Sequence, residues 1–330
     1  MRIALDAMGG DYAPAEVVLG AIQVAARPGF DNEIVLVGDS DKISAVLAEA
    51  GVAVGPTLSI RHASEVIEMH EHPAQSIRRK RDSSLVICGQ MVKSGEASAT
   101  VSAGNTGAAM AIGALDIGRI PGIERPAIAT TLPTSKGISL LVDAGANVDC
   151  SPNNLLQFAI MGSHYAERVL KLQNPSIGLL NVGTEEGKGN ELTKAAYPLL
   201  KSAPINFIGN VEGKDVWEHS SDVVVCDGFA GNVLLKTAEG FADWMVQMIK
   251  TEAKAGSPED QAAIKTLLGR LFQRIDWSEY GGAPLLGVNG VSIISHGRSK
   301  AKAIASAITQ AIFAAESDFV GAIRDGLAES

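Results

Sequence analysis

Residues 99–110 read A-T-V-S-A-G-N-T-G-A-A-M and contain the pattern on which the rest of the chain is built. Residues 99–102 are apolar or β-branched, as in a buried strand, and the apolar run 108–115 predicts a helix. Between them, Gly104 and Gly107 flank two small polar residues. The stretch therefore predicts a strand, a tight turn and a helix, which is the repeating unit of α/β folds.

This turn is also a candidate phosphate site. Glycine lets the backbone approach a ligand closely, and the free N–H groups at the start of a helix bind anions. Asn105 and Thr106 are residue types that cap helices. We predict that Gly104, Asn105, Thr106 and Gly107 form a phosphate cradle. The alternative is an ordinary strand-to-helix turn, because small residues are common in such turns.

Composition excludes several classes of function. The chain has 330 residues, of which 46% are hydrophobic and 5% aromatic, so it can bury a large core of small aliphatic side chains. A net charge of −9 argues against nucleic acid as a partner. Cys88, Cys150 and Cys226 lack metal-ligand spacing and predict a reduced, cytoplasmic protein with no metal site. We expect no signal peptide, no membrane span and at most peripheral association with the inner face of the membrane.

Strands and helices alternate along the chain. This spacing predicts a three-layer, Rossmann-like α/β fold with a mostly parallel sheet and helices on both faces. Residues 130–142 predict two strands around a Pro-Gly turn, which makes the sheet mixed. We expect one domain over residues 1–330. The first predicted strands are 3–8, 33–37 and 58–62, and the helices between them are 13–26 and 42–50.

Five predicted strands end in loops that combine glycine with Asp or Asn. Ligands of α/β sheets gather at the carboxyl ends of strands, so we expect these loops to share one polar rim. Asp6, Asp11, Asp143, Asn147 and Asp227 are the supporting polar residues. The loops are residues 6–11, 102–107, 143–147, 181–189 and 227–232.

The region after residue 232 predicts a helical hairpin over about residues 233–276. Residues 233–254 carry one apolar stripe, and Gly256-Ser257-Pro258 ends that helix. The second helix places apolar residues at helical spacing: Ile264, Leu267, Leu268, Leu271, Phe272 and Ile275. This hairpin packs on its own domain, forms a dimer interface or contacts a membrane surface, and spacing alone does not decide among the three.

The glycine-rich block 280–298 ends in His296 and Arg298. We predict that His296 lies where a strand ends and the last helix begins. A histidine there acts as an acid, a base or an anion ligand, or it simply caps the turn.

Seven short motifs, taken together and in order, resemble the bacterial phosphate acyltransferase family, PlsX. The resemblance covers essentially the whole chain. It implies transfer of a long-chain fatty acyl group from acyl carrier protein to inorganic phosphate, which gives acyl phosphate for phospholipid synthesis. The motifs are D-A-M-G-G-D-Y-A-P (6–14), S-A-G-N-T-G-A (102–108), D-A-G-A-N (143–147), N-V-G-T-E-E-G-K-G (181–189), D-G-F-A-G-N (227–232), G-G-A-P-L-L-G-V-N-G (281–290) and S-H-G-R-S (295–299).

The resemblance also implies partners. It implies a homodimer in which the helical hairpin supports dimerisation and association with the membrane surface. A membrane-bound glycerol-3-phosphate acyltransferase is a further expected partner. Acyl carrier protein is acidic, and Arg78, Arg79, Lys80 and Arg81 offer four consecutive cations for its docking. A solvated helix face is the alternative for this cluster.

The implied reaction needs few catalytic groups. Phosphate is itself the nucleophile that attacks the thioester, so neither a catalytic triad nor a cofactor is expected. We predict that Lys188 neutralises anionic charge and that Asn232 donates to phosphate or to the carbonyl oxygen. His296 would protonate the leaving thiolate. Asp6 and Asp11 orient these donors or only cap the first turn, and a solvated loop lysine is the alternative for Lys188.

Three other functions compete with this interpretation. An NAD-dependent dehydrogenase suits the sheet, but no G-x-G-x-x-G follows the first strand. An acyltransferase with Cys226 as its nucleophile is the second, although a buried strand cysteine is the simpler interpretation. A non-catalytic module that binds acyl carrier protein or membrane is the third, and it predicts binding without turnover.

Overall fold

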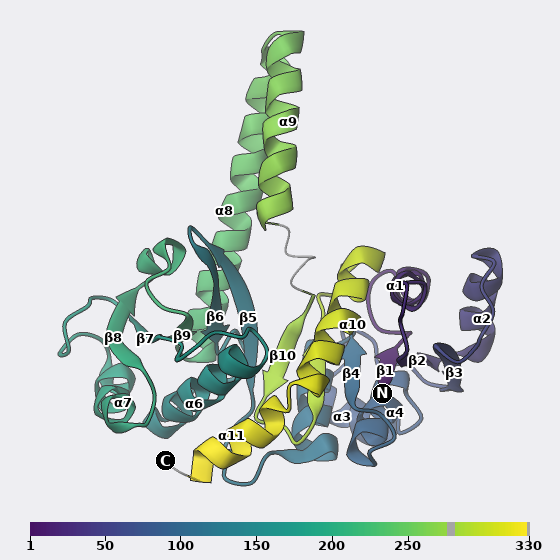
Figure 1. The fold of residues 1–330 in the computed structure, drawn as a ribbon, viewed down its shortest axis with the longest axis horizontal. Coiled ribbons are helices and arrows are strands. Elements are labelled where there is room, and N and C mark those ends of the chain that lie inside the picture. The colour runs from purple at the N-terminus through teal and green to yellow at the C-terminus, as the bar shows by residue number, and fades with distance from the viewer. Residues whose placement is uncertain (276–280, 329–330) are drawn as a thin grey trace.

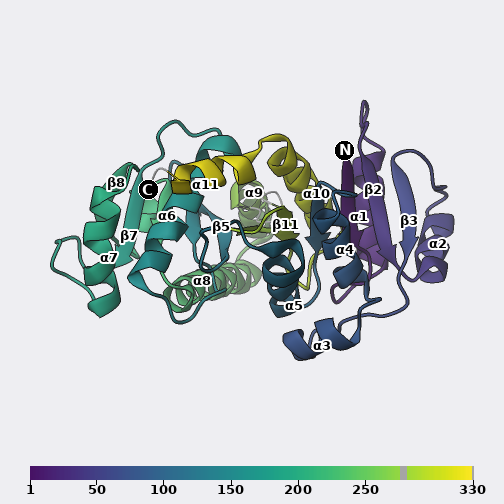
Figure 2. The same cartoon turned by 90° about the horizontal axis from the view of Figure 1, so that it is seen from below.

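The computed structural model describes residues 1–275 and 281–328, with side chains for 1–271 and 281–327. An eleven-stranded sheet runs through the molecule with helices on both faces, which confirms the predicted α/β fold (Figures 1 and 2). The strands are β1 (Arg2–Asp6), β2 (Glu33–Gly38), β3 (Leu58–His62), β4 (Ala99–Ser102), β5 (Ala127–Thr134), β6 (Gly137–Val142), β7 (Ile177–Asn181), β8 (Phe207–Glu212), β9 (Val223–Val225), β10 (Ala283–Leu286) and β11 (Val291–Ile294).

The sheet consists of two parallel groups that run in opposite directions. Its order is β3-β2-β1-β4-β11-β10-β5-β6-β9-β7-β8, with parallel pairing up to β11 and again from β6 onward. β10 and β5 pair antiparallel with each other and with their outer neighbours. The carboxyl ends of the two groups therefore lie at opposite edges of the sheet. The predicted antiparallel pair, β5 and β6, is part of the reason, because it reverses the second group.

The helices cover both faces of the sheet. They are α1 (Ala15–Ala25), α2 (Ser40–Glu49), α3 (Pro73–Arg79), α4 (Ser84–Lys93), α5 (Thr106–Ile112), α6 (Pro152–Arg168), α7 (Glu191–Ser202), α8 (Gly228–Ala255), α9 (Pro258–Ile275), α10 (Ala301–Glu316) and α11 (Phe319–Ala328). A π-helical segment (Gly113–Gly118) continues α5, and a 3₁₀ turn (Asp215–Glu218) follows β8. Helix α4 escaped sequence analysis because nearly all of its residues are buried, so it lacks a polar stripe.

Two apolar clusters form the core, one on each face of the sheet. Successive residues of a strand point to opposite faces. Leu36 of β2 accordingly lies in the cluster that contains Phe158 of α6, whereas Val35 and Val37 lie in the cluster that contains Ile112 of α5. Because both faces are covered, these strands are apolar throughout rather than alternating.

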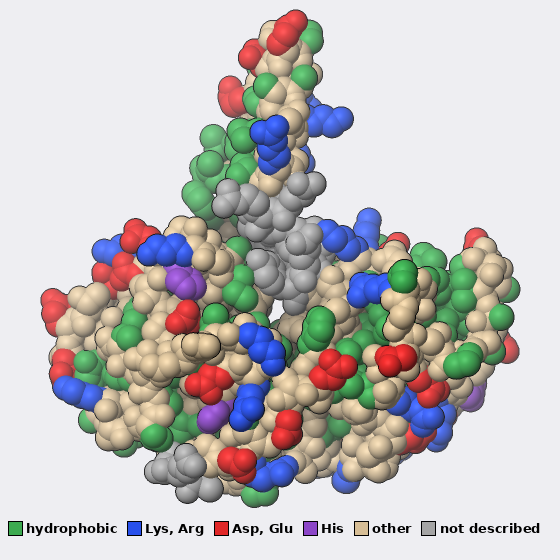
Figure 3. All heavy atoms as spheres, in the orientation of Figure 1, with side chains coloured by type: hydrophobic (Ala, Val, Ile, Leu, Met, Phe, Trp, Pro, Cys, Tyr) green, Lys and Arg blue, Asp and Glu red, His purple; other side chains and the backbone are tan. Residues whose placement is uncertain are grey.

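Helices α8 and α9 project from the body as a hairpin (Figure 1). Hydrophobic side chains gather along the α8 side of this projection (Figure 3), where Phe241 and Trp244 are 59% and 53% exposed. The predicted contributions of Phe272 and Ile275, together with residue Tyr280, fall outside the described side chains. None of the described helices has the length and hydropathy that a membrane span needs.

Candidate active site

A cavity of about 830 Å³ lies between the two strand groups, where residues of α5, α8 and α10 line it. This volume is within the range of small-molecule sites, about 300–1,000 Å³. Four of the five predicted loops reach it, because Asp11, Thr106, Gly145 and Asn232 all line it. His296 lines it as well. The polar rim therefore exists, although it forms between the strand groups rather than along one edge.

Asp6 ties the first two loops together. Its carboxylate is 2% exposed and accepts hydrogen bonds from the hydroxyls of Ser84 (2.6 Å) and Ser102 (2.7 Å). The same Ser102 hydroxyl accepts from the backbone N–H of Gly104 at 3.0 Å. Burial raises the pKa of Asp6, and the two serine hydrogen bonds oppose that rise. Asp6 thus positions the cradle from beneath and does not reach the cavity lining.

The glycines of the cradle allow close packing between loops. A Cβ on Gly9 would lie 2.7 Å from the backbone nitrogen of Gly104, and a Cβ on Gly107 would lie 2.6 Å from Cγ of Pro73. The close contact with α3 therefore explains why residue 107 is a glycine. Thr106 is the cradle residue whose exposed side chain lines the cavity.

Asn105 caps α5, as predicted, since its Oδ1 accepts from the N–H of Ala108 at 3.0 Å. Its Nδ2 donates to the carbonyls of Glu68, Met69 and Glu71 at 3.0–3.1 Å. These bonds hold the segment before α3 beside the cavity, where Met69 contributes to the lining. The phosphate-binding role of the cradle remains a prediction, with backbone N–H groups and Thr106 as its donors.

Asp143 organises the loop after β6. It is fully buried, and its carboxylate accepts from the backbone N–H groups of Ile128, Gly145, Ala146 and Asn147. The side chain of Asn147 donates to the same carboxylate at 2.9 Å and to the carbonyl of Pro126 at 2.8 Å. Burial raises the pKa of Asp143, and these hydrogen bonds oppose the shift. Both residues shape the loop from inside.

Helix α8 brings its N-terminus to this loop. Asp227 caps the helix by accepting from the N–H of Ala230 at 2.8 Å. A Cβ on Gly231 would lie 1.9 Å from the carbonyl oxygen of Asp143, so only glycine permits this approach. Asn232 follows, exposed and lining the cavity, with its Oδ1 3.6 Å from the position of a Cβ on Gly145. The structure thus places an amide group at the start of a helix and facing the cavity.

The loop after β11 closes the opposite side. The backbone N–H of Asp11 donates to the carbonyl of Gly297 at 2.8 Å, which joins this loop to the first one. His296 is exposed, and its Nδ1 accepts from the N–H of Arg298 at 3.2 Å. A neutral imidazole with Nδ1 as acceptor carries its proton on Nε2. His296 can therefore donate a proton from Nε2 at the cavity.

Cations dominate the charged lining of the cavity. Arg298, Lys300, Lys302 and Lys236 face Asp11 and Glu239. Lys236 pairs with Glu239 at 2.7 Å, and Lys300 lies 5.8 Å from the ring centre of Tyr12. In a chain of net charge −9, this concentration of cations favours an anionic ligand.

Lys236 and Ser295 line the cavity and were not among the predicted site residues. Lys236 lies four residues after Asn232 on α8, and this helical spacing could have indicated a shared face. Ser295 is 3% exposed, and its hydroxyl has no hydrogen-bond partner among the described residues. No local pattern distinguishes Ser295 from other strand serines.

Lys188 lies outside the set of residues that line the cavity. It is exposed on the loop between β7 and α7, where its backbone N–H donates to Glu185 at 3.0 Å and its carbonyl accepts from Asn181 at 3.1 Å. This loop follows β7, whose neighbour β9 leads directly into Asp227. The catalytic role of Lys188 stays a prediction.

The four consecutive cations at residues 78–81 are not equivalent. Lys80 pairs with Glu71 and donates to the carbonyl of Val66 at 2.6 Å, and Arg81 lies 3.4 Å from Asp116. Hydrogen bonds from Lys80 and then from Ser76 lower the pKa of Glu71 to about 2. Arg78 and Arg79 remain exposed at the end of α3.

Cys226 is 3% exposed at the end of β9. Burial raises the pKa of its thiol well above the ordinary value, and Sγ donates to the carbonyl of Asp143 at 3.6 Å. A buried thiol of this kind is not a nucleophile. This environment supports the interpretation of Cys226 as a buried structural residue.

Comparison with known proteins identifies relatives over the whole chain. The family model described as fatty acid synthesis protein matches residues 1–321. The phosphate acyltransferase of Desulfitobacterium hafniense (strain DSM 10664 / DCB-2) is 54% identical over 330 residues, which cover 99% of this chain and 98% of that protein.

Solved structures share the fold at low identity. The branched-chain phosphotransacylase from Enterococcus faecalis V583 superposes with a TM-score of 0.61 at 12% identity, covering 96% of this chain and 99% of that one. The EutD phosphotransacetylase from Staphylococcus aureus superposes with a TM-score of 0.60 at 14% identity, covering 96% and 94%. At this identity the likeness concerns the fold alone.

The buried carboxyl of Asp6 predicts a pH-dependent stability difference. Its folded pKa is raised above 3.8, so the native state binds the proton more tightly than the unfolded chain. The stability of the wild type relative to Asp6→Asn should therefore fall as pH rises from 4 through the folded pKa, by up to about 1.4 kcal/mol per pH unit. Chemical denaturation of both proteins between pH 4 and 7 measures this difference. A difference that stays constant or grows with pH would contradict the assignment.

Proposed function

This chain belongs to the phosphate acyltransferase family and is an acyltransferase, and we propose that it transfers a long-chain acyl group from acyl carrier protein to inorganic phosphate. The product is an acyl phosphate for phospholipid synthesis. The observation that carries this proposal is the cavity, where a cationic rim meets the N-terminus of α8 and the Nε2 face of His296.

The reaction requires positioning more than covalent catalysis. An oxygen of phosphate attacks the thioester carbonyl carbon, a C–O bond forms, and the C–S bond breaks as the thiolate leaves. A dianion and a developing oxyanion must be stabilised together, which cations and preorganised N–H donors achieve. Arg298, Lys300 and Lys236 supply positive charge at the lining, and the N-terminus of α8 adds the partial positive charge of its helix dipole.

Each predicted site residue has a role in this scheme. Thr106 and the backbone at the start of α5 bind phosphate, and Asn232 donates to the carbonyl oxygen or to phosphate. His296 transfers the Nε2 proton to the leaving thiolate, which is a modest demand because a thiol has a pKa of about 8.5. Lys188 approaches from the loop after β7 and neutralises charge on the donor or phosphate. Asp6, Asp11, Asp143, Asn147 and Asp227 hold the loops that carry these groups.

The carrier protein docks on the exposed cations of α3. Arg78 and Arg79 project from the end of this helix, and the segment before it is fixed to Asn105 of the cradle. A docked acidic partner would therefore lie next to the site. Complementary charge of this kind mainly raises the association rate and falls with salt.

The hairpin of α8 and α9 mediates self-association and contact with the membrane surface. Phe241 and Trp244 lie 5.6 Å apart and are largely exposed, a pattern that marks an interaction surface. A homodimer would bury this apolar face while the rest of the hairpin meets lipid. The protein would then act as a peripheral cytoplasmic enzyme that supplies a membrane-bound glycerol-3-phosphate acyltransferase.

Release of carrier-protein thiol from palmitoyl-acyl carrier protein, measured with and without inorganic phosphate, tests the reaction. We expect release to require phosphate, and hydroxylamine to trap an acyl phosphate. Lys188→Ala should lower kcat/KM at least about 100-fold, because removing a charge-stabilising donor costs about 2.7–4 kcal/mol. Lys93→Ala, an exposed lysine at the end of α4, is the matched control and should retain full activity.

Other outcomes assign other functions. Thiol release at the same rate with and without phosphate would indicate a thioesterase or a cysteine acyltransferase. Binding of the carrier protein with no release at all would support the non-catalytic module. Equal rates for Lys188→Ala and wild type would remove Lys188 from the mechanism.

Charge reversal tests the docking surface. Arg78→Glu/Arg79→Glu should raise KM for acyl-acyl carrier protein at least about tenfold at low salt, with kcat nearly unchanged, because exposed charges steer encounter rather than chemistry. Lys171→Glu/Lys194→Glu makes the same charge change at exposed positions elsewhere. Equal KM increases in both double variants would show a net-charge effect instead of a docking surface.

A charged hairpin tests self-association. Trp244→Glu places a carboxylate on the exposed apolar face of α8, and we expect dimer dissociation in sedimentation velocity, with a shift of at least tenfold in the dissociation constant. Lys250→Glu, on the same helix, controls for added negative charge. A Trp244→Glu protein that remains dimeric but no longer sediments with anionic lipid vesicles would assign this face to membrane instead.

A further inference from the structure

The sheet divides between β10 and β5. Within the described residues, β10 pairs with β5 only through Leu285 and Leu286, which face Ile128 and Ala127. Ala283 and Pro284 pair with β11 instead, and β5 beyond Ile128 pairs with β6. The two strands therefore separate. We call the gap between residues 281–283 and residues 130–133 the interstrand fork.

The cavity of the candidate site enters this fork. Thr130 and Ile128 of β5 point to the face that carries α8, whereas Thr131 and Pro133 point to the opposite face. All four residues line the same cavity. A cavity that contacts side chains on both faces of one strand passes through the plane of the sheet, and the fork is where the sheet leaves it room.

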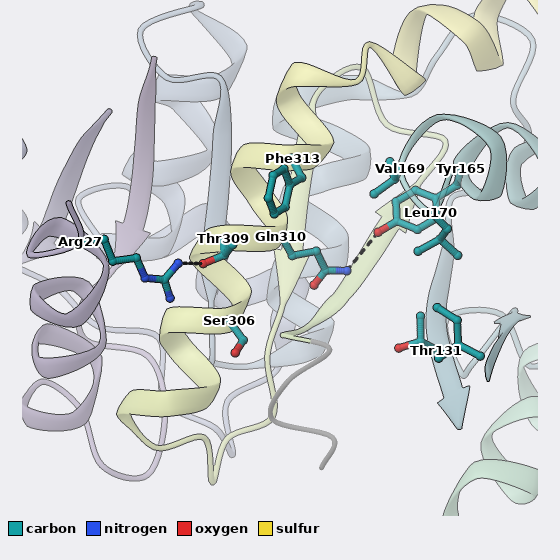
Figure 4. A pocket seen from close by; sticks show the side chains of 10 residues that line it. Arg27, Thr131, Tyr165, Val169, Leu170, Ser306, Thr309, Gln310 and Phe313 are labelled. Atoms are coloured by element: carbon teal, nitrogen blue, oxygen red, sulfur yellow. Dashed lines mark hydrogen bonds between the residues drawn. The ribbon is translucent and has the colours of Figure 1, made fainter. Parts of the chain in front are cut away.

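A second cavity of about 290 Å³ lies on the other face, between α10 and the end of α6 (Figure 4). Phe313 of α10 lies across it from Val169, and Ser306 of α10 lies across it from Thr131. Thr131 lines this cavity as well as the first one. The two cavities therefore adjoin at the fork, and we call the second one the α10–α6 groove.

Gln310 borders the junction of the two cavities, beside Thr131. Its Nε2 donates to the hydroxyl of Tyr165 at 3.0 Å (Figure 4), and its Oε1 accepts from the N–H of Gly282 at 2.8 Å. Gly281 has φ +81°, and a Cβ there would lie 2.8 Å from Oε1 of Gln310. Glycine thus lets the chain before β10 lie directly against α10.

The path changes from cationic to apolar along its length. At the rim are Arg298, Lys300 and Lys302, whereas Leu235, Ala283 and Ile294 line the cavity toward the fork. Beyond Thr131 the groove is lined by Ile138, Val169, Leu170 and Phe313, and on its α1 side the guanidinium of Arg27 donates to the hydroxyl of Thr309 at 2.8 Å. Such a path matches a molecule with an anionic head and a long apolar chain.

We propose that the acyl chain of the donor passes through the interstrand fork and ends in the α10–α6 groove. This assignment rests on the proposed function and adds the determinant of chain length to it. The thioester carbonyl would lie at Asn232 and His296, and the chain would leave the rim toward Thr131. Burying one more methylene strengthens binding about fourfold, so the groove selects long chains over short ones.

Filling the groove tests the proposal. Ser306→Phe places a ring between α10 and Thr131 of β5, where the two cavities adjoin, and it should lower kcat/KM for hexadecanoyl-acyl carrier protein at least about tenfold. Activity with the octanoyl donor should change less than about twofold, because a short chain ends before the groove. Glu316→Phe adds the same ring at an exposed position of α10 outside both cavities and should affect neither donor.

A binding measurement separates this proposal from the proposed reaction. Titration calorimetry with pantetheine thioethers carrying C16 or C8 chains needs no turnover. We expect wild type to bind the C16 compound at least about tenfold more tightly and Ser306→Phe to lose that preference. Tight C16 binding without phosphate-dependent thiol release would contradict the proposed reaction but would still support the proposed acyl-chain site.

Three results would overturn the chain site. One is equal C16 and C8 affinity in wild type. Another is Ser306→Phe with an unchanged melting temperature and unchanged chain preference. The last is an equal loss of kcat/KM with both donors in Ser306→Phe, which would indicate that the groove binds the pantetheine arm or only maintains the fold.

Discussion

A carboxylate buried in a protein is stable only when hydrogen-bond donors surround it, and this constraint shapes both halves of the site. Asp143 gathers four backbone N–H groups and the side chain of Asn147, and Asp6 gathers the hydroxyls of Ser84 and Ser102. Each carboxylate thereby fixes the loop that follows its own strand. The loops are rigid because relaxing them would leave buried charge without partners, and rigid loops are what a site working by positioning requires.

The location of the site follows from strand direction. Two parallel groups of opposite direction cannot share one edge, so the loops after β4, β11, β6 and β9 meet across the junction of the groups. At that junction β10 pairs first with β11 and then with β5, and the partner change opens the fork. The cavity with the cationic rim and the α10–α6 groove thus become neighbours through a single feature of sheet topology.

The charge at the cavity lining is opposite in sign to the net charge of the chain. The protein carries a net charge of −9, yet Arg298, Lys300, Lys302 and Lys236 line one cavity with only Asp11 and Glu239 as acidic neighbours. The negative surface elsewhere repels anions, and the cationic lining attracts them to one place. The hairpin helix α8 also exposes apolar side chains, around Phe241 and Trp244.

Local sequence determined the elements and their loops. Periodicity located β1–β6 and the hairpin helices, and the small polar residues at strand ends indicated Asn105 as a cap and Asp227 as part of a loop of the site, because these effects act over a few residues. Tertiary structure decided the rest. Strand direction in the second group and the burial of α4 depend on segments far apart in sequence. So do the ion pairs of Lys80 and Arg81 with acidic residues and the position of Lys236 in the cavity lining. The same holds for the Ser295 hydroxyl, which has no hydrogen-bond partner among the described residues. A periodic pattern records which face of an element is buried, but not which element covers it.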